Sequence, residues 1–367
     1  MTISQTLISW YHQHKRNLPW RSTTDPYKIW LSEVILQQTR VSQGMDYYYR
    51  FLERFPDVFS LASAEEQDVL KLWQGLGYYS RARNLHHAAK TVVQEYGGQF
   101  PRSYEGLLKL KGIGEYTAAA IASIAFDIVV PVIDGNVARV LSRIHSIEEP
   151  VNSPAGMKRL RQIASELIPA NDPATFNQAI MEFGALHCKP SNPECRSCPL
   201  RLECSALKTN SVAEFPRKIK ASVVKELFFY YLVIQYSIND ETFVLLNHRQ
   251  KQGIWKNLYD FPLIESSSAL EVGSILDSPV FQNLIPATSI IKLNFSSEYI
   301  HLLSHRKITA QFIRIDLDSP PANMGSFGGS PVSEVDKYPV SRLVERYLEE
   351  EWEEGREEGR KKTKGKR

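Results

Sequence analysis

Residues 110–122 read LKGIGEYTAAAIA and residues 129–136 read VVPVIDGN, and these two stretches decide the fold. Gly112 and Gly114 bracket one apolar residue, and a helix is expected directly after them. Such a turn presents unpaired N–H groups at the positive end of a helix, where a phosphate can bind, and Thr117 is a candidate phosphate ligand. Asp134 follows an apolar run and can either return to the turn or cap the helix that begins at Asn136. The pattern predicts a phosphate-binding hairpin followed by a carboxylate, which indicates chemistry on a nucleic-acid unit.

Chain length, net charge and the lack of long apolar runs limit the possible classes of protein. The chain has 367 residues, which is more than one ordinary core holds, so two domains are expected. The net charge of +3 neither requires nor excludes a nucleic-acid partner. No signal peptide is expected in residues 1–20, and no apolar run of membrane-spanning length occurs. We therefore expect a cytoplasmic protein, associated with the nucleoid where it binds DNA.

The first 205 residues are predicted to form an all-helical domain. Asp25-Pro26, Ser153-Pro154 and Asp172-Pro173 each place a capping side chain before a proline at the first helical position. Ser63 and Glu66 have the spacing of a capping box for a helix that ends near Trp73.

The character of the sequence changes after Cys204. Residues 206–220 are polar and are expected to be a linker. Residues 227–234 and 242–246 are apolar and flank an Asn239-Asp240 turn, which predicts a hairpin. With further strands expected at 290–295 and 307–315, a small α+β domain spans residues 221–348. The charged tail, residues 349–367, is expected to be disordered.

All four cysteines lie within one short segment. Cys188, Cys195, Cys198 and Cys204 follow the pattern C-x6-C-x2-C-x5-C, which is typical of a metal site and not of disulfides in a chain that is not exported. A zinc site remains an alternative, although zinc sites more often pair two C-x2-C elements. Unequal gaps between four thiolates suit a four-iron four-sulfur cluster.

Together these motifs resemble the helix-hairpin-helix DNA glycosylases of base excision repair, and the cysteine spacing is similar to that of the endonuclease III and MutY families. The resemblance implies a helical glycosylase domain with an iron–sulfur loop, one 4Fe-4S cluster, and a C-terminal Nudix (MutT)-like domain. Lyase members of the superfamily carry a lysine two positions after the second glycine of the hairpin. Tyr116 occupies that position here and cannot form an imine, so the chain resembles the monofunctional MutY family.

The same resemblance assigns the catalytic residues. Glu33 has no cation three or four residues away on its predicted helix, so burial would raise its pKa toward that of a general acid. Glu33 is expected to protonate the departing adenine and to activate water, while Asp134 stabilises the cationic sugar, either electrostatically or as a transient covalent partner. Tyr116 and Asn136 are expected to position these groups.

DNA contacts follow from the resemblance as well. Gln38 and Tyr78 are expected to wedge into the duplex, Arg21 and Leu36 to line the adenine pocket, and Gly112, Gly114 and Thr117 to bind the backbone. The expected partner of the monomeric protein is double-stranded DNA that contains adenine opposite 8-oxoguanine or guanine.

The C-terminal domain lacks the glutamates of an active Nudix box, because residues 263–270 read LIESSSAL. Recognition of 8-oxoguanine is the expected role, through Ser304 and His305, although Leu303 replaces the aromatic residue of the family. Two alternatives stay open: an endonuclease III-like glycosylase/lyase for oxidised pyrimidines, and a non-catalytic iron–sulfur protein that binds lesions.

Overall fold

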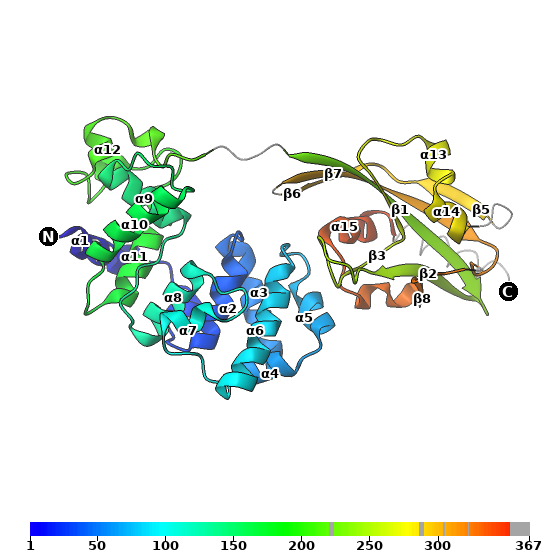
Figure 1. The fold of residues 1–367 in the computed structure, drawn as a ribbon, viewed down its shortest axis with the longest axis horizontal. Coiled ribbons are helices and arrows are strands. Elements are labelled where there is room, and N and C mark those ends of the chain that lie inside the picture. The colour runs from blue at the N-terminus through cyan, green and yellow to red at the C-terminus, as the bar shows by residue number, and fades with distance from the viewer. Residues whose placement is uncertain (220–223, 286–289, 304, 322, 353–367) are drawn as a thin grey trace. The chain divides into compact units, whose positions relative to one another are not determined.

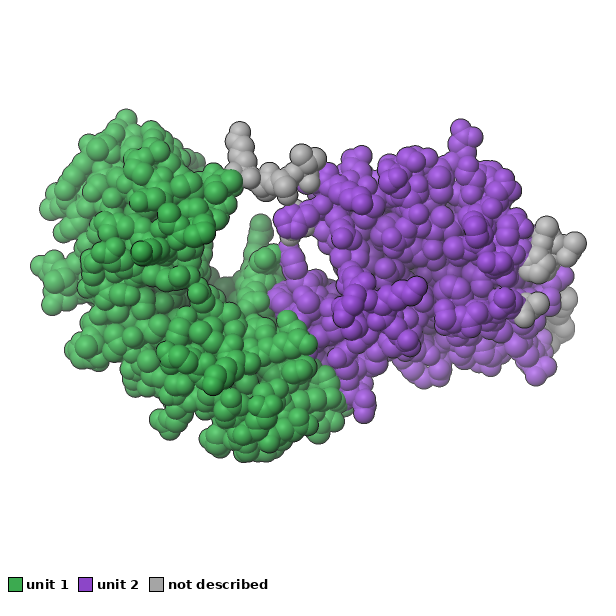
Figure 2. Space-filling view, in the orientation of Figure 1, with its two compact units in different colours: residues 1–64, 84–221 green, residues 65–83, 222–367 purple. Residues whose placement is uncertain are grey.

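The computed structural model describes residues 1–219, 224–285, 290–303, 305–321 and 323–352. The chain divides into two compact units, coloured green and purple in Figure 2. Unit 1 comprises residues 1–64 and 84–221, and unit 2 comprises residues 65–83 and 222–367. In the described residues no helix is both long and apolar enough to span a bilayer.

Unit 1 is built from helices, as predicted, and they are visible at the blue to green end of Figure 1. The longer helices are α1 (Ile3–His14), α2 (Pro26–Leu36), α3 (Val41–Arg54), α8 (Glu115–Phe126), α9 (Gly135–His145), α10 (Pro154–Leu167) and α11 (Pro173–Leu186). The shorter ones are η1 (Pro19–Arg21), α4 (Val58–Ser63), α7 (Tyr104–Leu108), η2 (Cys195–Ser197), α12 (Ser205–Lys208) and η3 (Val212–Glu214). Helix α6 (Ser80–Tyr96) begins in unit 2 and continues into unit 1.

The predicted helix starts at three X-Pro sites are confirmed. Asp25, Ser153 and Asp172 are the N-caps of α2, α10 and α11, and each side chain accepts a backbone N–H hydrogen bond of 2.9–3.3 Å. The predicted capping box at Ser63 is wrong, because Ser63 is the last residue of α4, and Glu65 precedes α5 (Glu66–Trp73) without a capping side chain.

Helix α8 lies at the centre of unit 1. Its residues from Thr117 to Ile124 are all buried, and α2, α7 and α11 pack against it. The small alanine side chains allow these neighbours to approach closely on every side, which explains why an alanine-rich helix with little amphipathicity is stable here. The sequence that decides the fold therefore also forms the centre of the helical core.

Unit 2 combines α5 with an eight-stranded sheet. The strands are β1 (Lys225–Ile238), β2 (Glu241–His248), β3 (Tyr259–Asp260), β4 (Leu263–Ser266), β5 (Ile290–Phe295), β6 (Tyr299–Leu303), β7 (Arg306–Leu317) and β8 (Gly328–Pro331). The helices are α13 (Val272–Leu276), α14 (Pro279–Leu284), η5 (Val332–Lys337) and α15 (Arg342–Glu350). Strands β1 and β7 pair in parallel along eleven positions and form the centre of the sheet, visible in Figure 1. Eight consecutive residues of β1 are buried, as expected for a strand covered on both faces.

The predicted β1–β2 hairpin is confirmed. Asn239 and Asp240 form its two-residue turn with φ values of 48° and 65°. Positive φ at both central residues is the requirement of a type I′ turn, which Asn and Asp tolerate better than most residues.

Two segments carry more structure than the sequence predicts. In the expected linker, Ala206 and Phe215 are buried with Cys204, and the Arg217 carbonyl accepts a hydrogen bond from the Val151 N–H. At the other end, α15 continues to Glu350, and Trp352 is buried against Phe261. Ordered chain therefore extends beyond residue 348, whereas residues 353–367 of the expected tail lie outside the described residues.

Candidate active site and cysteine loop

Helix α2 places Glu33 in the interior of unit 1. Its side chain is only 9 % exposed, and Tyr27 and residues 29–35 of the same helix are buried too. Burial raises the pKa of Glu33 to about 7, and the negative charge of Asp134 adds to the rise, while hydrogen bonding with Tyr116 and the charge of Arg21 oppose it. Glu33 is therefore a carboxylic acid whose proton is available near neutral pH.

Asp134 is the N-cap of α9. Its Oδ1 accepts hydrogen bonds from the backbone N–H groups of Asn136 at 2.9 Å and Val137 at 2.7 Å, and its Oδ2 accepts one at 2.7 Å from the Asn136 side-chain amide. Burial raises the pKa of Asp134, and these three hydrogen bonds oppose the rise by stabilising the carboxylate. The capping interpretation of Asp134 is confirmed, and its catalytic role stays a prediction.

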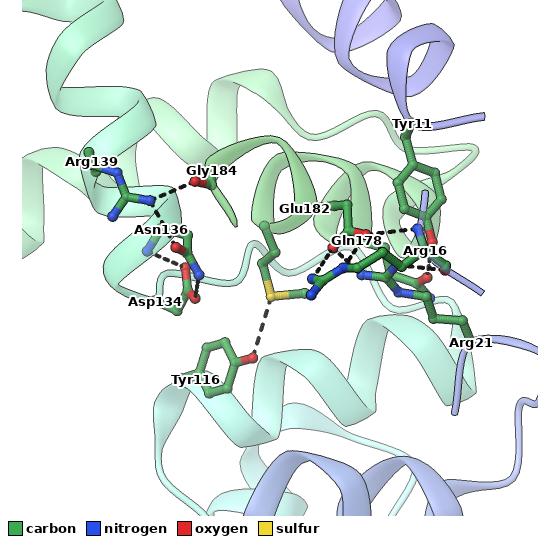
Figure 3. Close-up of polar contacts among 11 residues, drawn as sticks. Tyr11, Arg16, Arg21, Tyr116, Asp134, Asn136, Arg139, Gln178, Glu182 and Gly184 are labelled. Carbon is green, nitrogen blue, oxygen red and sulfur yellow. Dashed lines mark hydrogen bonds and ion pairs between the residues drawn. The ribbon is translucent and has the colours of Figure 1, made fainter. Parts of the chain in front are cut away.

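Tyr116 lies in the first turn of α8, directly after the glycine hairpin. Its hydroxyl donates a hydrogen bond to Sδ of Met181 at 3.4 Å (Figure 3). Burial raises the pKa of Tyr116 well above its ordinary value, and the negative charges of Glu33 and Asp134 raise it further. Because the phenol stays protonated, it can donate to either carboxylate.

The hairpin before α8 depends on one glycine. Gly112 has φ of +82°, and a Cβ built there would lie 2.6 Å from Cβ of Asn84. Gly114, the N-cap of α8, has φ of −88° and open space around the position of a Cβ. Gly112 is thus required by the backbone and by packing, whereas Gly114 keeps the N-terminus of α8 free of side chains.

A cavity of about 310 Å³ brings these side chains together. Its lining includes the predicted residues Arg21, Glu33, Leu36, Tyr116, Asp134 and Asn136. The structure therefore unites residues that are up to 115 positions apart in the chain, as the positions of Arg21 and Asn136 show.

The sequence reasoning missed Glu182, which lies in the same cavity on α11. Its carboxylate, only 1 % exposed, accepts paired hydrogen bonds from Arg21 at 2.8 and 2.7 Å and from Arg16 at 2.9 and 2.5 Å (Figure 3). Burial alone would raise the pKa of Glu182, but these hydrogen bonds lower it to about 2. Glu182 fixes the position of Arg21, and no local motif marks it, because its partners are more than 160 residues away.

Asn136 is held from its other side by Arg139. The Arg139 guanidinium donates to Asn136 Oδ1 at 2.9 Å, to the Gly184 carbonyl at 2.7 Å and to the Cys188 carbonyl at 2.8 Å. Figure 3 shows the hydrogen bonds from Arg139 to Asn136 and to Gly184. Helices α9 and α11 are close at this point, since a Cβ on Gly184 would lie 2.7 Å from Cβ of Asn136. The arrangement orients Asn136, and Asn136 in turn holds Asp134.

The four cysteines follow α11 in one loop. All four thiols are free: Cys188, Cys195, Cys198 and Cys204. Burial raises the pKa of the last three, and negative charge on neighbouring cysteines raises it further, which shows that these side chains lie near one another. Arg143 donates to Cys188 Sγ at 3.3 Å, and its backbone carbonyl accepts from Cys204 Sγ at 3.4 Å. No group of three or more His, Cys, Asp or Glu that could hold a single metal ion is found in the described ranges.

The residues expected to contact DNA differ in side-chain exposure and in backbone conformation. Gln38 is exposed in the loop after α2 with φ of 57°, and Tyr78, in unit 2, is 48 % exposed with φ of 48°. Positive φ is uncommon for such residues and is found mainly at turns and functional sites. The side chain of Thr117, by contrast, is 2 % exposed and accepts a hydrogen bond from Gln37 at 3.2 Å. The buried Thr117 side chain is not exposed to a phosphate, and the expected contribution of Thr117 to backbone binding stays a prediction.

Of the two residues expected to read 8-oxoguanine, Ser304 lies outside the described residues. His305 is exposed in the turn between β6 and β7, and its carbonyl accepts a hydrogen bond from the Lys225 N–H at 3.1 Å. The role of both residues stays a prediction.

The comparisons with known proteins agree with this geometry. Residues 31–176 match the family model described as HhH-GPD superfamily base excision DNA repair protein, and residues 231–350 match the NUDIX domain. The solved structure of a thermostable thymine-DNA glycosylase is similar to 56 % of this chain and 95 % of its own, with 29 % identity and a TM-score of 0.53.

Curated relatives extend the similarity over most of the chain. The adenine DNA glycosylase of Buchnera aphidicola subsp. Baizongia pistaciae is 38 % identical over 307 residues, which are 83 % of this chain and 83 % of that protein. The adenine DNA glycosylase of Mus musculus is 37 % identical over 86 % of this chain and 71 % of its own length. The chain therefore belongs to the adenine DNA glycosylase family of the helix-hairpin-helix superfamily, whose members hydrolyse N-glycosyl bonds in base excision repair.

Proposed function

We propose that this protein is a monofunctional glycosylase that removes adenine mispaired with 8-oxoguanine or guanine in double-stranded DNA. The observation that carries the proposal is the meeting of Glu33, Tyr116 and Asp134 at one cavity. Adenine inside a duplex is not accessible, so the nucleotide leaves the stack and enters this cavity before it reacts.

Two carboxyl groups with different roles divide the chemistry. Glu33, protonated near neutral pH, donates its proton to the five-membered ring of adenine, so that the base leaves as a neutral molecule. The sugar then carries oxocarbenium-like positive charge, which the ionised Asp134 stabilises. Glu33, now ionised, takes a proton from the water that adds to the sugar carbon. Tyr116 and Asn136 hold the two carboxyl groups in place.

Two alternative activities are distinguished by experiment. Single-turnover release of adenine from a duplex with one adenine:8-oxoguanine pair is expected for the wild-type protein and not for Glu33→Gln. A protein that binds this duplex without releasing adenine would instead be a lesion-binding protein. Borohydride trapping on oxidised-pyrimidine DNA is expected to give no covalent complex, because no lysine occupies position 116; a trapped imine would support the lyase alternative.

The cysteine loop would hold one 4Fe-4S cluster. Four free thiols that share one loop, two of them in contact with Arg143, provide the soft donor set that such a cluster requires. We assign the cluster the role of a scaffold for a loop that also carries Lys189, Arg196 and Arg201, three cations that can meet phosphates. Iron and sulfide analysis of protein purified without oxygen is expected to give four of each per chain; one zinc per chain would contradict this assignment.

The C-terminal domain would read the lesion opposite adenine. The lack of paired glutamates in residues 263–270 argues against Nudix hydrolysis, and Ser304 and His305 are the residues we assign to recognition. Replacing Ser304 with Ala is expected to slow adenine release opposite 8-oxoguanine more than opposite guanine.

A further inference from the structure

The turn that displays Tyr78 is part of unit 2, although it lies within the range that matches the helical family model. It has the sequence Gln74-Gly75-Leu76-Gly77-Tyr78-Tyr79 and takes positive φ at Gly75, Gly77 and Tyr78. Three such residues in four positions define a particular backbone path, which must be stabilised by surrounding contacts.

The inner side of the turn is held by α5 and α6. The indole N–H of the fully buried Trp73 donates to the Gly77 carbonyl at 3.0 Å. Arg81 donates to the carbonyls of Leu76 at 3.2 Å and Gly77 at 3.3 Å, and its guanidinium lies 5.7 Å from the centre of the Tyr78 ring.

Both ends of the turn hold the backbone of a single distant residue, Val340. The Tyr79 hydroxyl, in a side chain only 4 % exposed, donates to the Val340 carbonyl at 2.8 Å, and the Val340 N–H donates to Gln74 Oε1 at 3.3 Å. The amide of Gln74 also donates to Glu345 of α15 at 2.8 Å. Val340 is thus hydrogen-bonded through both its N–H and its carbonyl group, by residues on the two sides of the turn. These bonds attach the turn specifically to Val340.

Val340 is itself part of the sheet. It forms a parallel bridge with Tyr259 of β3, whose N–H donates to the Pro339 carbonyl at 2.8 Å. Strand β3 pairs with β2, and β2 with β1, which lies beside β7 and the His305 turn. Hydrogen bonds thus connect the Tyr78 turn to the sheet that we assign to lesion recognition.

We propose that Gln74 and Tyr79 are positioning residues that fix the Tyr78 turn to this sheet, so that Tyr78 enters the duplex only in register with the lesion-reading strands. The inference rests on the proposed function and on the expectation, from the family resemblance, that Tyr78 wedges into the duplex near the damaged guanine. It adds that the position of Tyr78 is fixed by the C-terminal sheet and not by the helical unit that carries Glu33.

The test removes the hydrogen bonds to Val340. Tyr79→Phe keeps the ring and deletes the bond to the Val340 carbonyl. Gln74→Met keeps the side-chain length and deletes the bond from the Val340 N–H, together with the bonds of Gln74 to Glu345 and Lys71. Tyr27→Phe is the matched control, since the Tyr27 hydroxyl is also in a side chain 4 % exposed and donates to a backbone carbonyl, that of Phe55, at 2.7 Å. Tyr27→Phe is expected to lower the melting temperature about as much as Tyr79→Phe.

The readout is the fluorescence of 2-aminopurine placed beside 8-oxoguanine, which rises when the stack opens, together with the single-turnover rate of adenine release. Tyr79→Phe and Gln74→Met are each expected to reduce the fluorescence rise toward that of Tyr78→Ser. Tyr79→Phe is expected to slow release about tenfold, the effect of one lost hydrogen bond, and Gln74→Met at least as much, because Gln74 loses its other bonds as well. The double variant is expected to lose little more, because both bonds hold one residue.

Equal fluorescence in wild type and Tyr79→Phe, or equal losses in Tyr79→Phe and Tyr27→Phe, would overturn the inference. The fluorescence step requires binding and no catalysis. If the wild-type protein released no adenine, the proposed function would fail, while the fluorescence comparison would still decide whether Val340 holds the wedge.

Discussion

At the scale of single residues, the environment of Glu33 turns an ordinary carboxyl group into an acid for neutral pH. The sequence showed that no cation lies beside Glu33 on its helix, and burial does raise its pKa. Glu182 has the opposite environment, since two guanidinium groups lower its pKa to about 2. The sequence predicted the first and missed the second because the partners of Glu182 come from a segment far away in the chain.

The rate of adenine release is expected to depend on the protonation of Glu33. Because the acid form of Glu33 is the active one, the single-turnover rate should fall about tenfold per pH unit above pH 7. The measurement is a pH–rate profile on the adenine:8-oxoguanine duplex. A rate that rises with pH through 7 would rule out Glu33 as the proton donor.

Glu33 is also expected to make stability depend on pH. Its folded pKa of about 7 is above the ordinary value of 4.5, so the folded state favours the neutral form, and stability is lost as pH rises from about 4.5 to about 7. The full loss is about 3 kcal/mol at most. Glu33→Gln should remove this dependence. The melting temperature of the variant minus that of wild type should therefore be larger at pH 8 than at pH 4.5. An equal difference at the two pH values would contradict the burial of an ionisable group.

Asp134 combines two roles that substitutions can separate. Asparagine is as good an N-cap as aspartate, so Asp134→Asn should keep stability within about 1 kcal/mol of wild type while losing adenine release. Asp134→Ala should lose both the cap and the activity. Thermal unfolding measures the stability of the two variants, and single-turnover assays measure their adenine release. An active Asp134→Asn variant would show that Asp134 acts only as a helix cap.

At the scale of elements, local sequence signals predicted the turns and helix starts correctly. The Asn239-Asp240 hairpin and the three X-Pro helix starts depend on residues adjacent in sequence, and all were confirmed. The box at Ser63 failed because α4 ends at that residue, which depends on packing between helices and not on spacing. Thr117 was assigned to DNA for its place after the turn, although its side chain faces the helical core.

Replacing the two glycines of the hairpin before α8 with alanine should have different effects on stability. Gly112→Ala is expected to destabilise the protein by about 1–3 kcal/mol, because an L-residue is strained at φ of +82° and its Cβ would meet Asn84. Gly114→Ala should leave the free energy of unfolding within about 0.5 kcal/mol of wild type, since nothing lies near its Cβ.

DNA affinity provides the second measurement for this pair. If the N-terminus of α8 approaches a phosphate, Gly114→Ala should weaken binding of duplex DNA despite its normal stability. Unchanged affinity in Gly114→Ala would show that the phosphate binds elsewhere.

At the scale of the whole molecule, sequence order and spatial grouping differ. Residues 65–83 lie within the helical part of the sequence but belong to unit 2, where Gln67 contacts the Asn257 carbonyl and Lys71 the Tyr338 carbonyl. These contacts join positions 190 or more residues apart, and no local pattern in α5 indicates them. The two-domain organisation could be predicted from composition and motifs, whereas the assignment of residues 65–83 to unit 2 could not.

A chain ending at residue 221 should reveal this grouping. Without residues 222–367, the segment 65–83 loses the partners of its polar side chains, and its amide hydrogens are expected to exchange more than tenfold faster. The amides of α9 and α11 should be unaffected, which mass spectrometry of peptides can show. Unchanged exchange in residues 65–83 would mean that the helical part alone orders this segment.

The close approach of α9 and α11 at Gly184 has a consequence for tolerated variation. A methyl group at position 184 would push directly on Asn136, whose amide holds the carboxylate of Asp134. The same methyl group would lie 3.0 Å from the Asn136 carbonyl oxygen, so the backbone of α9 would have to shift as well. Position 184 should therefore appear, in a screen for adenine release, as a site where even the smallest side chain displaces a catalytic carboxylate, lowering activity and stability together.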